Sequence, residues 1–171
     1  MPRPATARRT LSALLTLALV ATLLVGTAPA RAAAAPACDR AALIASRLDE
    51  LGRDGFAWRL GTTPPGSWGW ASAGRGVTVS ETVPCDSDLI VSIVNHEWMH
   101  TQQYRAYPER SLRARVYGKA IETVADCGSM LLGSTVTPYL DERARDTCRA
   151  VAGCTPFELG AARRLLSAAG R

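Results

Sequence analysis

Both histidines of this chain lie four positions apart, with a glutamate directly after the first. The chain has 171 residues and two histidines, His96 and His100, and Glu97 lies between them. On an α-helix, residues four positions apart are separated by about 40° around the axis, so both imidazoles reach one point. Zinc accepts imidazole nitrogens at that separation. Glu97 would lie about 60° from His100, within reach of a metal-bound water without being a ligand.

This His-Glu-x-x-His arrangement predicts a metallopeptidase centre in which Glu97 is the general base. Zinc lowers the pKa of its bound water to about 7, and a glutamate can take the proton as that water attacks an amide carbonyl. The alternative is two histidines that lie in the core or on the surface of a helix. A buried Glu97 beside them disfavours this alternative, because a lone buried carboxylate is costly.

A catalytic zinc needs three protein ligands and an open position for water. The chain has no third histidine, so the third ligand must be a carboxylate or a cysteine. The segment "IETVADCGS" offers Glu122, with Asp126 four residues further along the same helical face. Glu122 would bind zinc, and Asp126 would accept the distal N–H of a ligand histidine, which fixes its tautomer. The alternative is a solvated acidic face, which the flanking Ile121 and Val124 disfavour.

Two helices must position these residues. The segment from Asp86 to Tyr104 has N-cap residues at its start and a recurring three- and four-residue spacing, which predicts a helix that carries the motif. A second helix is predicted from Leu112 to Leu132. Small residues on its face would let the two helices approach closely: Gly118, Ala125 and Ser129.

The remaining elements predict an α+β fold that is predominantly helical, with a short strand region before the motif helix. Further helices are expected at Asp39 to Arg53, Pro138 to Val151 and Thr155 to Ala168, the last with a capping box. Between Asp54 and Val83, glycine turns and alternating valines at positions 77, 79 and 83 predict short strands. Three tryptophans of this region are expected to cover a small core rather than hold a ligand: Trp58, Trp68 and Trp70.

Residues 1–32 have the order of a secretory signal peptide. Arginines precede the apolar run from Leu11 to Ala28, and small-residue sites such as "APA" and "ARA" follow it. We expect cleavage to leave an N-terminus between Arg31 and Cys38 and the protein to be secreted. An uncleaved anchor helix is the alternative, since the run is nearly long enough to span a bilayer. The stretch "ARRTLS" leaves the general and the twin-arginine export routes both open.

Removal of this leader leaves residues 33–171, a length that suits one domain with a modest core. The formal net charge of +5 falls to about +1, because the leader contains four arginines. Nucleic-acid binding therefore loses its main support. We expect a monomer that acts on a peptide or protein substrate and has no stable membrane association after cleavage.

Five cysteines follow the leader, and in an exported protein they predict disulfides and one unpaired thiol. Zinc ligation by thiolates is the alternative, but the chain has no Cys-x-x-Cys pair. Two bridges among five cysteines allow about fifteen pairings, so the connectivity is open. We expect Cys38 to pair with Cys85, and Cys127 to pair with Cys154 in preference to Cys148, which would hold Glu122 in place.

The motifs "HEWMHTQQ" and "ETVADC" resemble the gluzincins, in which a His-Glu-x-x-His helix is completed by a downstream Glu-x-x-x-Asp. They are still more similar to the small neutral zinc metallopeptidases, because Gln103 and Ala125 fit that narrower pattern. The resemblance covers His96 to Cys127, with weaker similarity in "GWASAGRGVTVSE". It implies a minimal zincin-like domain.

The resemblance implies Zn²⁺ ligation by His96, His100 and Glu122, with Glu97 as general base and Asp126 as a second-shell carboxylate. It also implies that an extended peptide adds along a strand at residues 77–81. Thermolysin-like enzymes place one further histidine near the scissile carbonyl, and this chain has none. A nearby arginine or one of four tyrosines could replace it, and the sequence does not select among them: Tyr104, Tyr107, Tyr117 and Tyr139.

Three hypotheses follow for the function. The first is a secreted zinc peptidase, the second is a zinc-binding protein without turnover, and the third is a disulfide-stabilised interaction domain with an incidental motif. Metal content separates the third from the other two, and peptide cleavage separates the first from the second.

Overall fold

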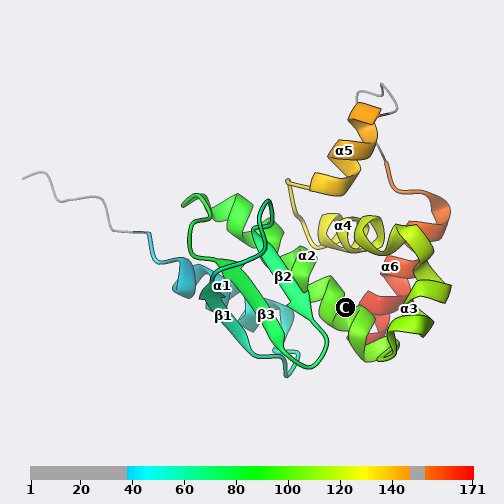
Figure 1. Ribbon diagram of the computed structural model, residues 1–171, viewed down its shortest axis with the longest axis horizontal. Coiled ribbons are helices and arrows are strands. Elements are labelled where there is room, and N and C mark those ends of the chain that lie inside the picture. Colours follow the sequence, from blue (N-terminus) through cyan, green and yellow to red (C-terminus); the bar gives the residue numbers. More distant parts are fainter. Residues whose placement is uncertain (1–37, 147–152) are drawn as a thin grey trace, which may run out of the picture. The chain divides into compact units, whose positions relative to one another are not determined.

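The computed structural model describes residues 38–146 and 153–171. Within these residues the fold is α+β and predominantly helical, as predicted, with six α-helices and one three-stranded sheet (Figure 1). The expected signal peptide, residues 1–32, lies outside the described residues. No described helix has the length and hydropathy needed to span a membrane.

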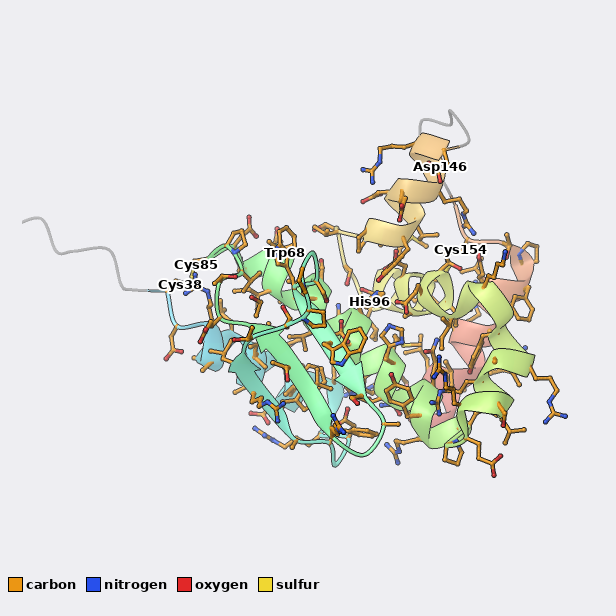
Figure 2. All side chains as sticks on the ribbon, in the orientation of Figure 1. Cys38, Trp68, Cys85, His96, Asp146 and Cys154 are labelled. Carbon is orange, nitrogen blue, oxygen red and sulfur yellow. A yellow bond between two sulfur atoms is a disulfide. The ribbon has the colours of Figure 1, made fainter. Side chains whose placement is uncertain are left out.

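Helix α1, Arg40–Leu51, begins where predicted. The side chain of Asp39 caps it by accepting a hydrogen bond from the backbone N–H of Ala42, and three apolar residues of one face are buried: Ile44, Leu48 and Leu51. The predicted Cys38–Cys85 disulfide is confirmed, and it ties the start of α1 to the segment before the motif helix (Figure 2).

The three strands form a sheet in the order β1-β3-β2. Strand β1, Trp58–Gly61, pairs parallel with β3, Gly76–Ser80, and β2, Gly69–Ser72, pairs antiparallel with β3. The strand expected to receive a peptide, residues 77–81, therefore coincides with the middle strand. That expectation is wrong, because both edges of β3 already pair with neighbours; β2 is an edge strand and lies against α2.

The expectation that all three tryptophans cover the core is also wrong. Trp58 packs against the core, but Trp68 and Trp70 are 47% and 53% exposed. Successive side chains of a strand point to opposite faces. Gly69 and Ala71 face α2, where Ala71 is buried and a Cβ at Gly69 would collide with a side chain of that helix. The exposed side chains of Trp68 and Trp70 therefore do not belong to the core.

Helix α2, Ser87–Ala106, carries the motif and is the central element of the fold. Asp86 caps it through a 3.0 Å hydrogen bond from the Leu89 backbone N–H. The helix contacts α1, β2, α4 and α6, and nearly all of its residues from Ile90 to Gln103 are buried. Because α2 is enclosed on several sides, its polar motif residues lie inside the molecule.

The helix predicted from Leu112 to Leu132 is broken into three parts. Helix α3, Arg110–Tyr117, is followed by a 3₁₀ turn, Gly118–Ala120, and by α4, Ile121–Leu131. The break occurs at Gly118, whose φ of 56° lies in the left-handed region that glycine tolerates. Gly128 of α4 also helps this helix to pack closely against α2, because a Cβ there would collide with the Met99 side chain.

Two shorter helices complete the fold. Helix α5, Pro138–Asp146, begins where predicted, and the rest of that predicted helix lies outside the described residues. Helix α6, Pro156–Ala168, has the predicted capping box between Thr155 and Glu158. The Cys127–Cys154 disulfide is confirmed and joins α4 to the segment before α6. Cys148 lies outside the described residues.

Candidate metal centre

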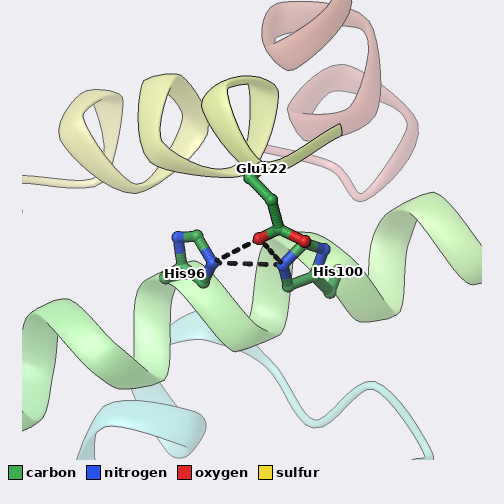
Figure 3. A group of neighbouring side chains, drawn as sticks. All are labelled: His96, His100 and Glu122. Atoms are coloured by element: carbon green, nitrogen blue, oxygen red, sulfur yellow. Dashed lines mark hydrogen bonds and ion pairs between the residues drawn. The ribbon is translucent and has the colours of Figure 1, made fainter. Parts of the chain in front are cut away.

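Three predicted ligands meet in the structure, two from α2 and one from the first turn of α4. Nε2 of His96 lies 3.1 Å from Nε2 of His100, and these two nitrogens lie 3.3 Å and 3.0 Å from Oε2 of Glu122 (Figure 3). Candidate ligand atoms of the three residues all lie within 4.8 Å of one another. The break at Gly118 ends α3 and lets α4 start separately, one residue before Glu122.

These separations fit a tetrahedral zinc site. Tetrahedral bonds of about 2.0–2.1 Å place two ligand atoms about 3.3 Å apart, close to the three distances found here. Two histidines and one carboxylate also form a common ligand set for catalytic zinc, with the fourth position left to water. The His96, His100 and Glu122 group can therefore hold a metal ion, and its donor set suits Zn²⁺.

Each histidine is oriented through its other ring nitrogen. Nδ1 of His96 lies 2.7 Å from Oδ1 of Asp126, and Nδ1 of His100 lies 2.8 Å from Oε1 of Gln103. A carboxylate or amide oxygen only accepts, so each Nδ1 must carry the proton. In the neutral imidazole each Nε2 then has a lone pair directed at the shared point between the three residues, as expected if Asp126 orients His96 for metal binding.

Asp126 has a second role that the sequence did not reveal. Its other oxygen, Oδ2, accepts hydrogen bonds from the backbone N–H groups of Tyr139 and Leu140 at 2.8 and 2.9 Å. These groups belong to the first turn of α5, where backbone donors have no partner within the helix. One fully buried carboxylate thus connects His96 with the start of α5.

The electrostatics of the group follow from burial and close contact. Burial alone would lower the pKa of His96, but hydrogen bonds to Asp126 and Glu122 outweigh it and raise the pKa to about 10. Burial would raise the pKa of Glu122, yet its contacts with both histidines hold that pKa well below its usual range. The metal-free group is thus held together by opposite charges, and a bound cation would replace the proton on His96.

Glu97 lies beside the three ligands but not among them. Its side chain faces β2, where it accepts a hydrogen bond from the backbone N–H of Ala71, and burial raises its pKa. A Cβ at Gly69 would lie 2.8 Å from Cδ of Glu97, so the glycine makes room for this carboxylate. The requirement for glycine at this position was not visible in the sequence, because it arises from two segments that meet in space.

A cleft of about 680 Å³ gives access to the group. It is lined by His96, Glu97, His100 and Glu122, by β2 and the loop before it, and by the first turn of α5. Of the four tyrosines considered, Tyr104 and Tyr139 line the cleft, whereas Tyr107 and Tyr117 pack against each other at a ring-centroid distance of 5.7 Å. The exposed Trp68 and Trp70 also line this cleft.

Gln103 is a residue to which the sequence assigned no role. It is fully buried, and besides accepting from His100 it donates from Nε2 to the backbone oxygen of Ile121 at 2.9 Å. Its position three residues after His100, on the same helical face, was the available signal.

No family model, curated protein or solved structure matches the chain. The interpretation of the site therefore depends on the site's own geometry.

Proposed function

We propose that this chain is a secreted zinc-dependent peptidase of the gluzincin type. The observation that carries the proposal is the group of two histidine nitrogens and one carboxylate oxygen, 3.0–3.3 Å apart, with a second acidic side chain, Glu97, beside it in the same cleft. Metal binding alone would not require an additional buried carboxylate that is not a ligand. A hydrolytic centre does, because the attacking water must lose a proton.

Bound zinc would supply Lewis acidity, which polarises a substrate carbonyl and makes water acidic. Glu97 takes the proton from the attacking water and delivers it to the departing amine. Asp126 and Gln103 accept from the Nδ1 atoms and would thereby keep both Nε2 atoms directed at a bound ion. The cleft between β2 and α5 would receive the peptide, and Gly69 leaves the Glu97 carboxylate free of side-chain obstruction.

The two disulfides support an extracellular location, because such bonds persist in oxidising compartments. We propose that the chain functions as a monomer on peptide or protein substrates, without nucleic acid and without a stable membrane anchor. Mass spectrometry of secreted material tests the export step, and an intact leader ahead of Arg31 would contradict it.

The decisive experiment combines metal analysis with digestion of a broad peptide library. We expect about one zinc per mature chain and cleavage of peptide bonds. Glu97→Ala should keep its zinc while turnover falls by about 10² or more, the scale of a lost general base. Glu81→Ala, at an exposed position outside this cleft, is the matched control and should remain active.

The outcomes separate the three hypotheses. A metal-free wild-type protein would leave only the interaction domain. Stoichiometric zinc without cleavage of any peptide would favour the inactive binder. A Glu97→Ala variant as active as the wild type would refute the proposed mechanism.

A further inference from the structure

The edge of β2 that faces away from β3 borders the cleft. A strand at the edge of a sheet presents backbone groups to which another chain can add. The Ser80 backbone N–H donates to the carbonyl of Trp68, so Trp68 directs its carbonyl at β3. Because this direction alternates along an antiparallel pair, Gly69 and Ala71 direct their backbone groups at the outer edge.

Three of these four outward backbone groups already have partners within the chain. The Ala71 carbonyl accepts a hydrogen bond from the Tyr104 hydroxyl at 3.0 Å, and the Ala71 N–H donates to Glu97. The Gly69 carbonyl accepts from the Ser67 hydroxyl. An added peptide strand would have to compete with these side chains for the same groups.

Tyr104 is held in place from the side opposite to β2. The guanidinium of Arg113 lies 4.6 Å from its ring centroid. Arg113 is itself buried, and it donates to the backbone oxygens of Tyr107 and Pro108 at 2.7 Å each. The phenol cannot leave its acceptor without losing this contact, so we expect it to stay on the Ala71 carbonyl when a peptide binds.

The hydrogen bond between Tyr104 and Ala71 closes the cleft at one end. Tyr104 is the last residue of α2 along the cleft and Ala71 is the last of β2, so their contact joins the two walls. Tyr104 follows His100 by one helical turn, about 6 Å, whereas the cleft extends to Leu89, about 10 Å before His96. An extended peptide advances about 3.3 Å per residue, so the open end holds more of it than the closed end.

We propose that Tyr104 is a specificity-determining residue whose hydroxyl withholds the Ala71 carbonyl from an added peptide strand. This inference rests on the proposed peptidase function, and it names the part of the substrate that the cleft recognises. Substrate residues toward the Leu89 end are bound, whereas residues toward Tyr104 are not held by β2. The preferred substrates are therefore peptides with several residues on one side of the scissile bond, whatever follows on the other side.

The test is a scan in which each backbone N–H of one library peptide is methylated in turn. The peptide is one that the zinc-loaded mature protein cleaves or, without turnover, retains. Methylation removes one donor, so it lowers affinity where that donor is bonded to the protein. In Tyr104→Phe the Ala71 carbonyl becomes available, and we expect KM to fall by about 3–10-fold, the scale of one added hydrogen bond. Methylation at one position that the wild type tolerates should abolish this gain.

Tyr107→Phe is the matched control, because it removes the same hydroxyl from a ring that packs against Tyr117 and does not line the cleft. Its methylation pattern should equal that of the wild type. Tyr104→Leu also lacks the donor and should show the same additional sensitive position as Tyr104→Phe. Calorimetric binding in a Glu97→Gln background separates affinity from turnover, since the glutamine oxygen can still accept from the Ala71 N–H.

Two results would overturn this inference alone. One is a Tyr104→Phe protein whose affinity stays within about twofold of wild type for every peptide. The other is a gain in affinity that no N-methyl group removes, since the added contact would then not be a backbone hydrogen bond. If the wild type binds peptides without cleaving them, the proposed function fails and the calorimetric scan still tests Tyr104. Peptides that bind neither protein would overturn both proposals.

Discussion

The two histidines of the His96, His100 and Glu122 group have the same proposed role and different surroundings. His96 donates to the carboxylate of Asp126, and Tyr139 stacks on its ring. His100 donates to the neutral amide of Gln103, and its aromatic neighbour Tyr104 is more distant. The hydrogen bonds are nearly equal in length, so the difference lies in charge rather than in geometry. His96 is the more strongly polarised of the two imidazoles, since an ionised acceptor makes the stronger bond.

The two partners also connect α2 to α4 in different ways. Asp126 belongs to α4 and reaches across to His96, whereas Gln103 belongs to α2 and reaches across to the backbone oxygen of Ile121. Glu122 lies directly after Ile121 and one helical turn before Asp126. The third ligand is thus held between two crosslinks, one charged and one neutral, which position it against both histidines.

The largest effect on zinc affinity is expected at Glu122, which contacts both histidines. Glu122→Ala removes the carboxylate that contacts both histidines, so zinc affinity should fall by more than the roughly 10–100-fold expected when a residue that only orients a ligand is lost. Competition titration with a chelator measures this affinity. Glu142→Ala serves as the control, and equal zinc affinity in the two variants would contradict ligation by Glu122.

Asp126→Asn tests the negative charge beside His96, because it replaces the carboxylate partner by an amide like the partner of His100. We expect zinc affinity to fall by about 10–100-fold, because the ligand loses the negative charge that raises its basicity. The same titration applies. Asp54→Asn is the matched control, since Asp54 also accepts a hydrogen bond from α2, through Thr101, but touches neither histidine. An unchanged affinity in Asp126→Asn would show that the charge is immaterial.

Gln103→Met tests the neutral partner of His100. It keeps the approximate shape of the side chain and removes its contacts with His100 and with the Ile121 backbone oxygen. Zinc affinity should fall by less than in Asp126→Asn, because an amide dipole is lost rather than a charge. Leaving the Ile121 oxygen without this partner should also cost about 1–3 kcal/mol in the free energy of unfolding. Gln102→Met, at the neighbouring buried glutamine, is the control. A larger loss of zinc affinity in Gln103→Met than in Asp126→Asn would contradict the greater contribution expected from the charged partner.

The smallest effect is expected at Glu158, whose carboxylate connects α6 with α4 and α5. Burial alone would raise the pKa of Glu158, but hydrogen bonds from Arg143, Thr123 and Thr155 outweigh it and lower the pKa to about 2. These bonds link α6 to α4 and α5. Because the unfolded chain takes up this proton first, stability is fully present above pH 4.5, the usual value, and is lost as the pH falls toward 2.

Chemical denaturation across this pH range measures the contribution of Glu158. In Glu158→Gln the free energy of unfolding should vary less between pH 4.5 and pH 2 than in the wild type. Glu81→Gln, at an exposed position, should follow the wild-type curve. Parallel curves for Glu158→Gln and the wild type would contradict this assignment.

Local sequence patterns predicted most of the helices for an identifiable reason. The caps at Asp39, Asp86 and Thr155 and the periodic apolar positions act within one or two turns, so they are visible in a short stretch. The prediction of one helix from Leu112 to Leu132 was too long. The periodic spacing of apolar residues continues through Gly118, while the backbone turns at that residue. The order of the strands was equally hidden, since pairing joins segments that are distant in the chain.

The order of the residues is enough to set the available chemistry: two histidines and a glutamate at helical spacing, an acidic pair downstream, and cysteines able to form the two observed bridges. Spacing fixes which side chains share a helical face, because the α-helix has one period. Packing between elements decides that Gln103 donates to the backbone oxygen of Ile121, that β2 rather than β3 borders the cleft, and that Asp126 accepts from the Tyr139 backbone N–H. Each of these contacts joins different elements of the fold, and no periodicity within one segment encodes such contacts.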